Sequence, residues 1–340
     1  MKKIRISIIG FGVIGSGVAK VISEKKGYIK SRHGIDLELV GIGERHGSIV
    51  CEDGIDPMEA YDLAKSREMY KHPCWKEEMS GIDVVREVNA DIVIEATPTN
   101  INSGEPGLSH MMTAFKNKRH VVTSNKGPLV VAYKELKRTA EENDVQFRFE
   151  ASVGGAMPVF NLVRESLQAN KMLGIEGILN GTCNYILTRM STEGLSYEHA
   201  LSEAQELGIA ETDPSYDVEG IDTACKLVIL ANAIFDMDAT YKDVEVEGIT
   251  GITPESLKLA SDEGYAIKLI GEVRDGLRVA PRLVPKDHPL AVGGTLNVIS
   301  LHTDLAGEIT VTGKGAGAIE TSSSILSDVI NISKYEFEGT

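Results

Sequence analysis

Cysteine is scarce in this chain of 340 residues, and so are aromatic residues, which make up 5% of it. The four cysteines, Cys51, Cys74, Cys183 and Cys225, stand far apart, and none falls in a CxxC or Cys/His spacing. That pattern argues against a zinc site and a disulfide framework and favours free thiols in a reducing compartment. We therefore expect a cytoplasmic protein.

Basic residues are outnumbered, since 35 Lys and Arg stand against 50 Asp and Glu and leave a formal net charge of -15. Binding to a phosphate backbone or an anionic membrane surface needs clustered cations, so neither nucleic acid nor a membrane is an expected partner. Long apolar runs are missing too. The run over residues 4–9 ends at Gly10, which is too short for a signal sequence or a membrane span.

What the chain does contain is an alternation of short β-branched runs with longer helical stretches. The strand-like runs lie at residues 4–9, 37–42, 91–96, 120–124 and 146–151. Such alternation predicts an α/β fold, a Rossmann-type doubly wound parallel sheet over residues 1–151. After residue 151 the strands and helices no longer alternate in this way. Helices followed by strand-like runs predict a second, α+β domain over 152–312 and a separate C-terminal segment over 313–340.

A GxGxxG motif joins the first predicted strand to a helical stretch over residues 16–24. Its residues are Gly10, Phe11, Gly12, Val13, Ile14 and Gly15. Gly10 would permit a tight turn, Gly12 a close approach of the backbone to a pyrophosphate, and Gly15 close packing of helix on strand. The motif in this context predicts a binding site for NAD or NADP.

The acidic residue expected after the second strand is Glu44, which comes late because residues 25–36 lengthen the connection. Glu44 could accept a hydrogen bond from a ribose 2′-hydroxyl, as in NAD. Arg45 and His46 follow directly, and a cation there could neutralise a 2′-phosphate, as in NADP. The residues favour NAD slightly and leave the choice between the two dinucleotides open.

Polar residues follow two further predicted strands, at the edge where doubly wound sheets bind their ligands. Thr97 follows one strand, and Ser124 and Asn125 follow the next, which makes these three residues candidate cofactor contacts. Lys126 comes directly afterwards, in what we expect to be a Gly-Pro turn. From there it could project toward a substrate beside the nicotinamide.

Residues 220–235 have helical spacing and are apolar on every face, which predicts a buried helix. Asp222 and Lys226 are its only charges, and their spacing of four places them on one side of adjacent turns. Breaking a buried ion pair costs about 3–5 kcal/mol, so such a pair suits a polar site better than it suits stability alone. The acids before the helix, which include Glu211 and Asp217, suit the ammonium group of an amino-acid substrate.

These residues resemble homoserine dehydrogenases through nearly the whole chain. The segments that carry the resemblance are the glycine motif and residues 124–126, 150–158, 180–187 and 208–226. The resemblance implies reversible NAD(P)H-dependent reduction of L-aspartate 4-semialdehyde to L-homoserine, on the route to threonine and methionine. It implies catalytic roles for Lys126, Lys226 and Asp222, and substrate contacts from Glu211, Asp217 and Thr182.

The same resemblance implies a sodium ion, with Glu150, Val153, Gly155 and Met157 as ligands, and a homodimer formed through the second domain. It implies that the C-terminal segment returns to the nucleotide domain and that Gly315 contacts the cofactor. One departure is Glu320, which stands where a proline is expected near the start of the last helix. We expect no ACT domain, and hence no threonine feedback through one.

Two other functions fit parts of the pattern. A phosphorylating semialdehyde dehydrogenase also has a Rossmann domain but needs a cysteine nucleophile, for which Cys183 is the best candidate. A non-enzymatic protein that senses the dinucleotide would need the glycine motif, but it would not need Lys126 and Lys226 in an apolar setting.

Overall fold

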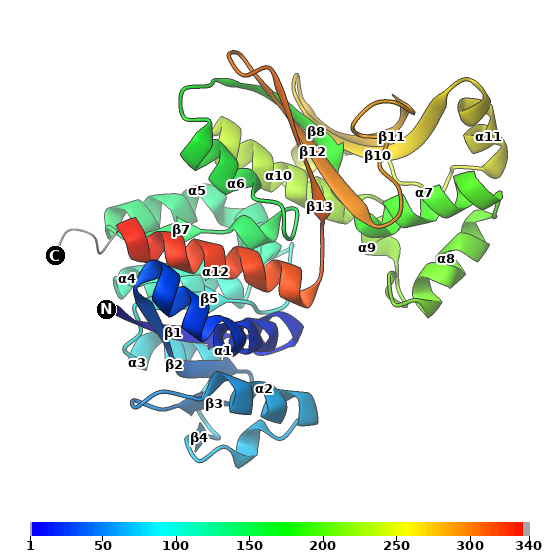
Figure 1. The fold of residues 1–340 in the computed structure, drawn as a ribbon. Coiled ribbons are helices and arrows are strands. Elements are labelled where there is room, and N and C mark those ends of the chain that lie inside the picture. Colours follow the sequence, from blue (N-terminus) through cyan, green and yellow to red (C-terminus); the bar gives the residue numbers. More distant parts are fainter. Residues whose placement is uncertain (1, 336–340) are drawn as a thin grey trace. The chain divides into compact units, whose positions relative to one another are not determined.

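The computed structural model describes residues 2–335, and the chain divides into two compact units (Figure 1). The first unit comprises Met1–Ser152 and Gly317–Thr340, and the second comprises Val153–Ala316. The C-terminal helix thus belongs to the first unit. Within residues 2–335, no helix has the length and apolar character needed to cross a membrane.

The first unit is built on a seven-stranded sheet in the order β4-β3-β2-β1-β5-β6-β7. The strands are β1 Lys2–Ile9, β2 Ile35–Glu44, β3 Gly47–Val50, β4 Trp75–Lys76, β5 Ile92–Glu95, β6 His120–Thr123 and β7 Phe147–Arg148. The run from β2 through β1, β5 and β6 to β7 is parallel throughout. The first four predicted strands and the Rossmann-type sheet are confirmed, whereas the fifth, expected over residues 146–151, is reduced to the two residues of β7 and is followed by a single turn at Glu150–Ser152.

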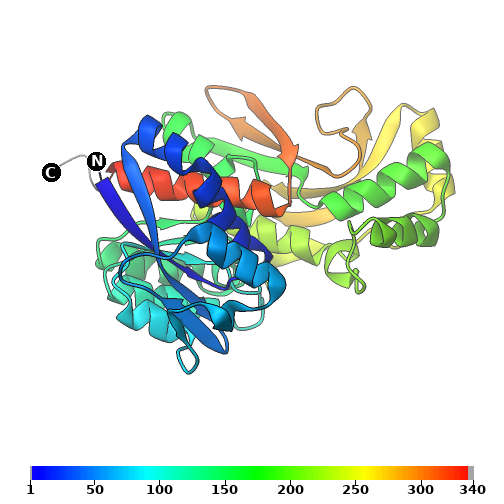
Figure 2. The same ribbon diagram turned by 60° about the horizontal axis from the view of Figure 1, so that its bottom comes forward.

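Helices cover both faces of this sheet. They are α1 Val13–His33, α2 Pro57–Ser66, α3 Gly81–Glu87, α4 Gly107–Lys116, α5 Lys126–Glu142 and α12 Ala318–Tyr335, with single turns at Met69–Lys71 and Glu150–Ser152. On one face, Ile6 of β1 shares a buried core with Ile22 of α1 and Ile325 of α12, and Figures 1 and 2 show these two helices side by side. On the other face, Val93 of β5 shares a second core with Leu136 of α5.

The helix after the glycine motif is longer than predicted. The connection expected over residues 25–36 is wrong, because α1 continues to His33 and ends where Gly34 adopts a φ of 68°. Ile29 is buried and anchors this extension, whereas residues 25–28 and Lys30 on either side of it are exposed. A single buried apolar residue in a polar stretch gives no helical periodicity, so this part of the helix could not be predicted from the sequence.

Beyond β2, the edge of the sheet also differs from expectation. The sequence predicted only surface helices and loops over residues 51–89, and it gave no signal for β3. The structure has α2 and α3 in this region, but it also has β4, which pairs antiparallel with β3, as β3 does with β2. These strands have four and two residues, too few to show a strand alternation in the sequence.

The second unit contains a six-stranded sheet in the order β13-β12-β8-β10-β11-β9. Its strands are β8 Met172–Ile178, β9 Val244–Val246, β10 Tyr265–Val273, β11 Leu277–Pro285, β12 Leu296–Thr303 and β13 Glu308–Lys314. Its helices are α6 Val159–Asn161, a π-turn Leu162–Ser166, α7 Gly181–Glu193, α8 Tyr197–Glu206, α9 Ser215–Val218, α10 Ile221–Phe235, a turn at Tyr241–Asp243 and α11 Pro254–Asp262. Apart from the parallel β9–β11 pair, its ladders are antiparallel, as an α+β domain requires.

Helix α10 is buried, as its apolar sequence predicted. Every residue from 222 to 232 is buried. The helix packs on the sheet at Gly271 of β10, where a Cβ would lie 3.1 Å from Thr223 and 3.4 Å from Leu227. The charges of Asp222 and Lys226 therefore lie inside the second unit.

Candidate active site

The glycine motif forms a tight turn between β1 and α1. Gly10 has a φ of 86°, and a Cβ there would lie 2.7 Å from the backbone nitrogen of Thr97. A Cβ on Gly15 would lie 3.1 Å from the Ile8 side chain, so this glycine lets α1 pack closely on β1. A Cβ on Gly12 would meet nothing within 4 Å. This open approach at the N-terminus of α1 fits the pyrophosphate of a dinucleotide.

The remaining residues of the motif divide between core and surface. Phe11 is buried at 4% exposure and Ile14 packs against the same core, whereas Val13 is 73% exposed. Glu44, the last residue of β2, accepts a hydrogen bond from the backbone N–H of Phe11 at 2.5 Å. Arg45 is exposed in the turn that follows. The carboxylate of Glu44 thus contacts the glycine turn directly.

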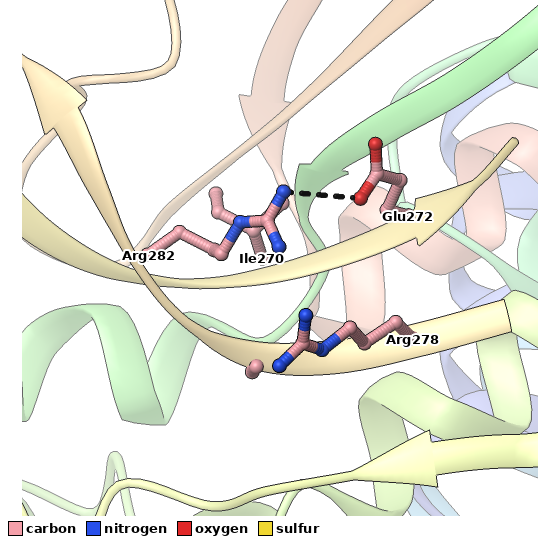
Figure 3. Close-up of a pocket in the computed structure, with 5 residues that line it drawn as sticks. Ile270, Glu272, Arg278 and Arg282 are labelled. Carbon is pink, nitrogen blue, oxygen red and sulfur yellow. Dashed lines mark hydrogen bonds and ion pairs between the residues drawn. The ribbon is translucent and has the colours of Figure 1, made fainter.

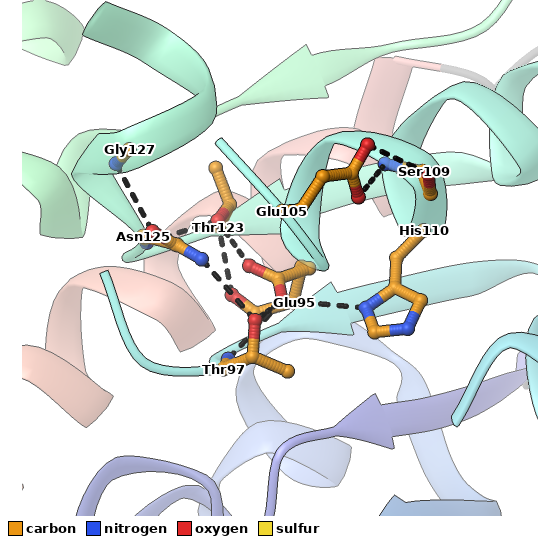
Figure 4. A network of polar contacts seen from close by, with 8 residues as sticks. All are labelled: Glu95, Thr97, Glu105, Ser109, His110, Thr123, Asn125 and Gly127. Carbon is orange, nitrogen blue, oxygen red and sulfur yellow. Dashed lines mark hydrogen bonds and ion pairs between the residues drawn. The ribbon is translucent and has the colours of Figure 1, made fainter. Parts of the chain in front are cut away.

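A buried carboxylate joins the ends of β5 and β6 (Figure 4). Glu95 is 0% exposed, and its Oε1 accepts hydrogen bonds from the backbone N–H of Thr97, at 3.1 Å, and from the hydroxyl of the same residue. Thr123 donates to its Oε2 at 3.3 Å, and Nδ1 of His110 lies 3.6 Å from Oε1. Glu95 therefore links the segment that follows β5 to the end of β6.

The candidate cofactor contacts after these strands lie together. The amide nitrogen of Asn125 donates to the hydroxyl of Thr97 at 3.2 Å, and the backbone N–H of Ser124 donates to the carbonyl of Glu95 at 3.3 Å. Thr97, Ser124 and Asn125 come from two segments that are distant in sequence. The network around Glu95 holds them at one edge of the sheet.

Lys126 lies on a helix and not in the turn that the sequence predicted. It is the first residue of α5, and Asn125 caps this helix by accepting a hydrogen bond from the N–H of Gly127 at 3.0 Å. Pro128 is tolerated because the first turn of a helix needs no intrahelical N–H donors. The Gly-Pro pair thus begins the helix.

In the second unit, Lys226 is held by two acceptors. Its Nζ lies 2.7 Å from Oδ2 of Asp222, one turn earlier on α10, and donates to the carbonyl of Leu179 at 2.5 Å. The side chains of Lys226 and Asp222 are 10% and 9% exposed. The two acceptors orient the ammonium group, and an ammonium group has three protons to donate.

A second carboxylate adjoins this pair. Asp217 of α9 and Asp222 both accept hydrogen bonds from the side-chain amide of Asn180, at 2.6 Å and 3.0 Å. Thr182, two residues further along, donates to the carbonyl of Ile209 at 3.1 Å. The structure thus brings Asp217, Asp222 and Lys226 together, with Asn180 among them.

Burial raises the pKa of Asp217, and the negative charge of Asp222 adds to this effect. Hydrogen bonds from Asn180 and Thr182 and the positive charge of Lys226 oppose it. Glu211 differs, because its carboxylate is exposed and its backbone carbonyl accepts from Gln205. Among the described contacts, none ties the carboxylate of Glu211 to Asp217 or Lys226.

Cys183 lies beside this cluster but is a poor nucleophile. It is 0% exposed, and its Sγ donates to the backbone carbonyl of Asp217 at 3.1 Å. Burial raises its pKa well above the ordinary value, and the charges of Asp217 and Asp222 raise it further. Since the thiolate is the reactive form, the arrangement argues against a phosphorylating dehydrogenase that uses this residue.

The residues for which a sodium site is expected divide between the two units. Glu150 belongs to the first unit, is 2% exposed, and donates its backbone N–H to Asp328 at 2.8 Å. In the second unit, Val153 and Met157 are buried at 0% and 1%. Gly155 adopts a φ of 57°, and a Cβ there would lie 2.6 Å from the backbone of Gly315. The turn over residues 153–157 therefore packs against the chain just after β13.

A small hollow lies on the second sheet, over strands β10 and β11 (Figure 3). It is lined by Ile270, Glu272, Arg278, Ala280 and Arg282. Nη2 of Arg282 lies 3.2 Å from Oε2 of Glu272. None of the predicted site residues lines this hollow, and two of its three charged side chains, Glu272 and Arg282, already pair with each other.

Two residues of the sites escaped the sequence reasoning. Asn180 stands directly before a Gly-Thr pair that starts α7, a pattern that indicates a helix cap but not a bridge between two acids. Glu95 ends a buried strand, where the sequence shows a carboxylate without its partners. No local signal pairs it with His110 or Thr123, because those residues lie on α4 and β6.

Comparison with known proteins agrees with this geometry. The family model described as homoserine dehydrogenase matches residues 158–330, and the one described as homoserine dehydrogenase, NAD binding domain, matches residues 10–150. Homoserine dehydrogenase of Methanocaldococcus jannaschii is 55% identical over 96% of this chain and 98% of its own length. The NAD(+)-dependent homoserine dehydrogenase of Pseudomonas canavaninivorans is 38% identical over 98% of this chain and 97% of its own.

Solved structures give the same result. The crystal structure of a putative homoserine dehydrogenase from Archaeoglobus fulgidus has a TM-score of 0.89 and 46% identity, and covers 97% of this chain and 99% of that one. A hyperthermophilic archaeal homoserine dehydrogenase in complex with NADPH has a TM-score of 0.85 and 30% identity, with 98% of each chain covered. With both family models and full-length relatives in agreement, the chain belongs to the homoserine dehydrogenase family.

Proposed function

We propose that this chain catalyses the reversible reduction of L-aspartate 4-semialdehyde to L-homoserine, a step toward threonine and methionine. The observation that supports this most strongly is the buried ammonium of Lys226, held 2.7 Å from Asp222 beside a second carboxylate, Asp217. A small substrate with one ammonium group and one reacting oxygen matches these charges.

Lys226 would act on the reacting oxygen of the substrate. Bound NADH or NADPH would supply the hydride to the aldehyde carbon, and the oxygen would then need a cation and a proton. The ammonium group can provide both, and its two fixed acceptors, Asp222 and the carbonyl of Leu179, hold it in one orientation. Lys126, at the start of α5, is the second cation that we propose for this oxygen.

Asp217, Glu211 and Thr182 would bind the rest of the substrate. Asp217 is half-buried and would accept from the substrate ammonium as a carboxylate, a stronger hydrogen bond than one between neutral groups. Thr182 lies in the first turn of α7, and its hydroxyl would form a hydrogen bond with the substrate. Glu211 is exposed and would contribute from the surface loop that precedes α9.

The dinucleotide would lie on the first unit. Its pyrophosphate would contact the motif from Gly10 to Gly15, and Thr97, Ser124 and Asn125 would contact the nicotinamide end. Glu44 would accept from the adenosine ribose, and because its carboxylate already contacts the glycine turn, we propose that NAD is preferred to NADP. Gly315, which belongs to the second unit, is a further proposed contact.

Three further properties rest on resemblance to the family. We propose a homodimer, a sodium ion held by Glu150 and by residues of the turn over 153–157, and a cytoplasmic location. Four free cysteines accord with that location. Sedimentation of the purified protein tests the dimer, and activity in sodium chloride compared with choline chloride tests the ion.

The decisive experiment follows the absorbance of NADH and NADPH with aspartate semialdehyde, and of NAD+ and NADP+ with L-homoserine. The wild type is compared with Lys126→Ala and Lys226→Ala, and we expect turnover in the wild type and its near loss in both variants. Lys268→Met is the matched control, because Lys268 is a buried lysine of the same unit whose Nζ donates to Asn184 at 2.8 Å and, within the described part of the chain, to no carboxylate. Absence of turnover with either substrate pair would refute the proposed reaction.

A further inference from the structure

Asn180 lies at the centre of the acidic cluster, although nothing in its sequence context marks it as a site residue. It is 4% exposed and precedes α7. Its amide nitrogen donates to Oδ1 of Asp217 at 2.6 Å and to Oδ2 of Asp222 at 3.0 Å. A side-chain amide has two N–H protons, so one asparagine can hold two carboxylates at once.

The orientation of this amide is fixed from its other end. Oδ1 of Asn180 accepts a hydrogen bond from the backbone N–H of Cys183 at 2.9 Å, which is the N-cap bond of α7. A flipped amide would turn its N–H groups toward the N–H of Cys183 and its oxygen toward two carboxylates. Both contacts would be repulsive, so the cap bond directs the donor edge at the acids.

Asn180, Asp222 and Lys226 thus belong to one connected network of hydrogen bonds, which returns to the backbone at Leu179. Oδ2 of Asp222 accepts from Asn180 and also lies 2.7 Å from Nζ of Lys226. Nζ of Lys226 in turn donates to the carbonyl of Leu179, the residue that precedes Asn180. The proposed catalytic lysine is therefore linked to Asn180 in two ways, through the carboxylate of Asp222 and through the backbone carbonyl of the preceding residue.

The two carboxylates need such a bridge because they repel each other. Asp217 lies on α9 and Asp222 on α10, and the negative charge of Asp222 disfavours ionisation of Asp217. The ionisable groups facing Asp217 are Asp222 and Lys226 of α10, Cys183 of α7 and the neighbouring Tyr216. Burial raises the pKa of Asp217, whereas the hydrogen bond from Asn180 lowers it.

We propose that Asn180 is a positioning residue of the reaction, which holds Asp217 in place to receive the substrate ammonium and Asp222 in place to orient Lys226. This inference rests on the proposed function of those three residues. Asn180 itself is buried behind them and is not proposed to contact the substrate.

The test separates the donor role of Asn180 from its capping role. Asp and Ser are both good N-cap residues, so Asn180→Asp and Asn180→Ser keep the bond to the N–H of Cys183. Neither can donate to two carboxylates. The aspartate adds a third negative charge, whereas the serine adds none.

The expected results follow from charge and geometry. The loss of a hydrogen bond to a charged group corresponds to a change of about 10–100-fold in a rate or equilibrium constant. We therefore expect kcat for L-homoserine to fall by about that factor in both variants. In Asn180→Asp, the acidic limb of the pH profile should move to higher pH by about one unit or more, because a nearby like charge stabilises the protonated form of Asp217. KM for the dinucleotide should stay unchanged, since the glycine motif belongs to the other unit.

Asn232→Asp is the matched control. Asn232 is likewise a buried asparagine but lies on α10; its amide bonds the backbone of Ala239 at 2.8 Å and 2.9 Å, and among residues 2–335 it touches no carboxylate. The Asn232→Asp substitution should lower the thermal stability of the protein and leave the pH profile of kcat unchanged. An Asn180→Asp enzyme with the wild-type kcat and pH profile would overturn the inference, and so would an equal shift in the control. Absence of turnover in the wild type would instead refute the proposed function.

Discussion

Lys226 and Asp222 form an ion pair within one helix, with Nζ of the lysine 2.7 Å from Oδ2 of the aspartate and both side chains about nine-tenths buried. The surrounding residues of α10 are apolar and buried. In such surroundings each charge depends on the other, because an unpaired buried charge is costly.

The pair should therefore behave differently in single and double variants. Asp222→Ala should destabilise the protein by about 3–5 kcal/mol, because it leaves the ammonium buried without its carboxylate. Adding Lys226→Met should restore much of that stability but no activity. Urea denaturation and turnover of the two single variants and the double variant measure both effects. Equal stability losses in Asp222→Ala and the double variant would contradict this account of the pair.

The glycine motif allows binding and folding to be separated. Gly12→Ala should leave the melting temperature unchanged, since the added methyl meets nothing within 4 Å, but it should weaken dinucleotide binding by about tenfold or more. Gly15→Ala should instead destabilise the fold by about 1–3 kcal/mol, because its methyl would press on the strand. Calorimetric titration and thermal denaturation distinguish the two. A Gly12→Ala protein that binds NADH normally would place the pyrophosphate elsewhere.

Much of this architecture could be predicted from local patterns. The strands of the parallel sheet and the buried pair on α10 each leave a signal within a few residues, either apolar periodicity or a spacing of four. Glu95 shows the limit of this reasoning. Its partners Thr97, Thr123 and His110 come from three places in the chain, and only the folded sheet brings them together.

The bridge made by Asn180 lay beyond prediction for the same reason. Its two acceptors lie 37 and 42 residues away, on different helices. The extension of α1 was missed for another reason, since residues 25–33 contain a single buried apolar side chain, Ile29. Periodicity detects a continuous apolar stripe but not an isolated anchor.

Glu44 should decide which dinucleotide the enzyme prefers. Glu44→Ala should lower kcat/KM for NADH by about 10–100-fold, the value of a hydrogen bond to a charged acceptor, and should change that for NADPH much less. Arg45→Ala should instead lower kcat/KM for NADPH more than that for NADH if the Arg45 cation neutralises a 2′-phosphate. Steady-state kinetics with both dinucleotides gives the ratio directly. An unchanged NADH-to-NADPH ratio in Glu44→Ala would remove Glu44 from the ribose site.

Cys183 should prove dispensable for the chemistry. Its thiol is buried, and its pKa is raised well above the ordinary value by burial and by the nearby carboxylates, so it is a neutral thiol throughout the usual assay range. Cys183→Ala loses only a weak hydrogen bond to the carbonyl of Asp217, and kcat should fall by less than about fivefold. Iodoacetamide should likewise leave the native enzyme active at pH 8. Loss of all turnover in Cys183→Ala would revive the covalent alternative.

Lys268 should make stability depend on pH in the alkaline range. It lies on β10 with 5% exposure, donates to Asn184 at 2.8 Å and to Thr188 at 3.4 Å, and burial lowers its pKa from 10.5 to about 8. Between these two values the unfolded chain binds more protons than the folded protein. The contribution of Lys268 to the free energy of unfolding therefore rises with pH across that window, by about 3 kcal/mol at most.

The difference in unfolding free energy between Lys268→Met and the wild type isolates this contribution. Relative to the wild type, the variant should be most stable below pH 8, and its relative stability should decline as the pH rises to 10.5, where the wild-type lysine is neutral in both states. Urea denaturation at several pH values measures the difference. Lys258→Met is the control, because Lys258 is exposed on α11 and its removal should leave the pH dependence unchanged. Parallel curves for Lys268→Met and the wild type would mean that Lys268 keeps its ordinary affinity for protons despite its burial.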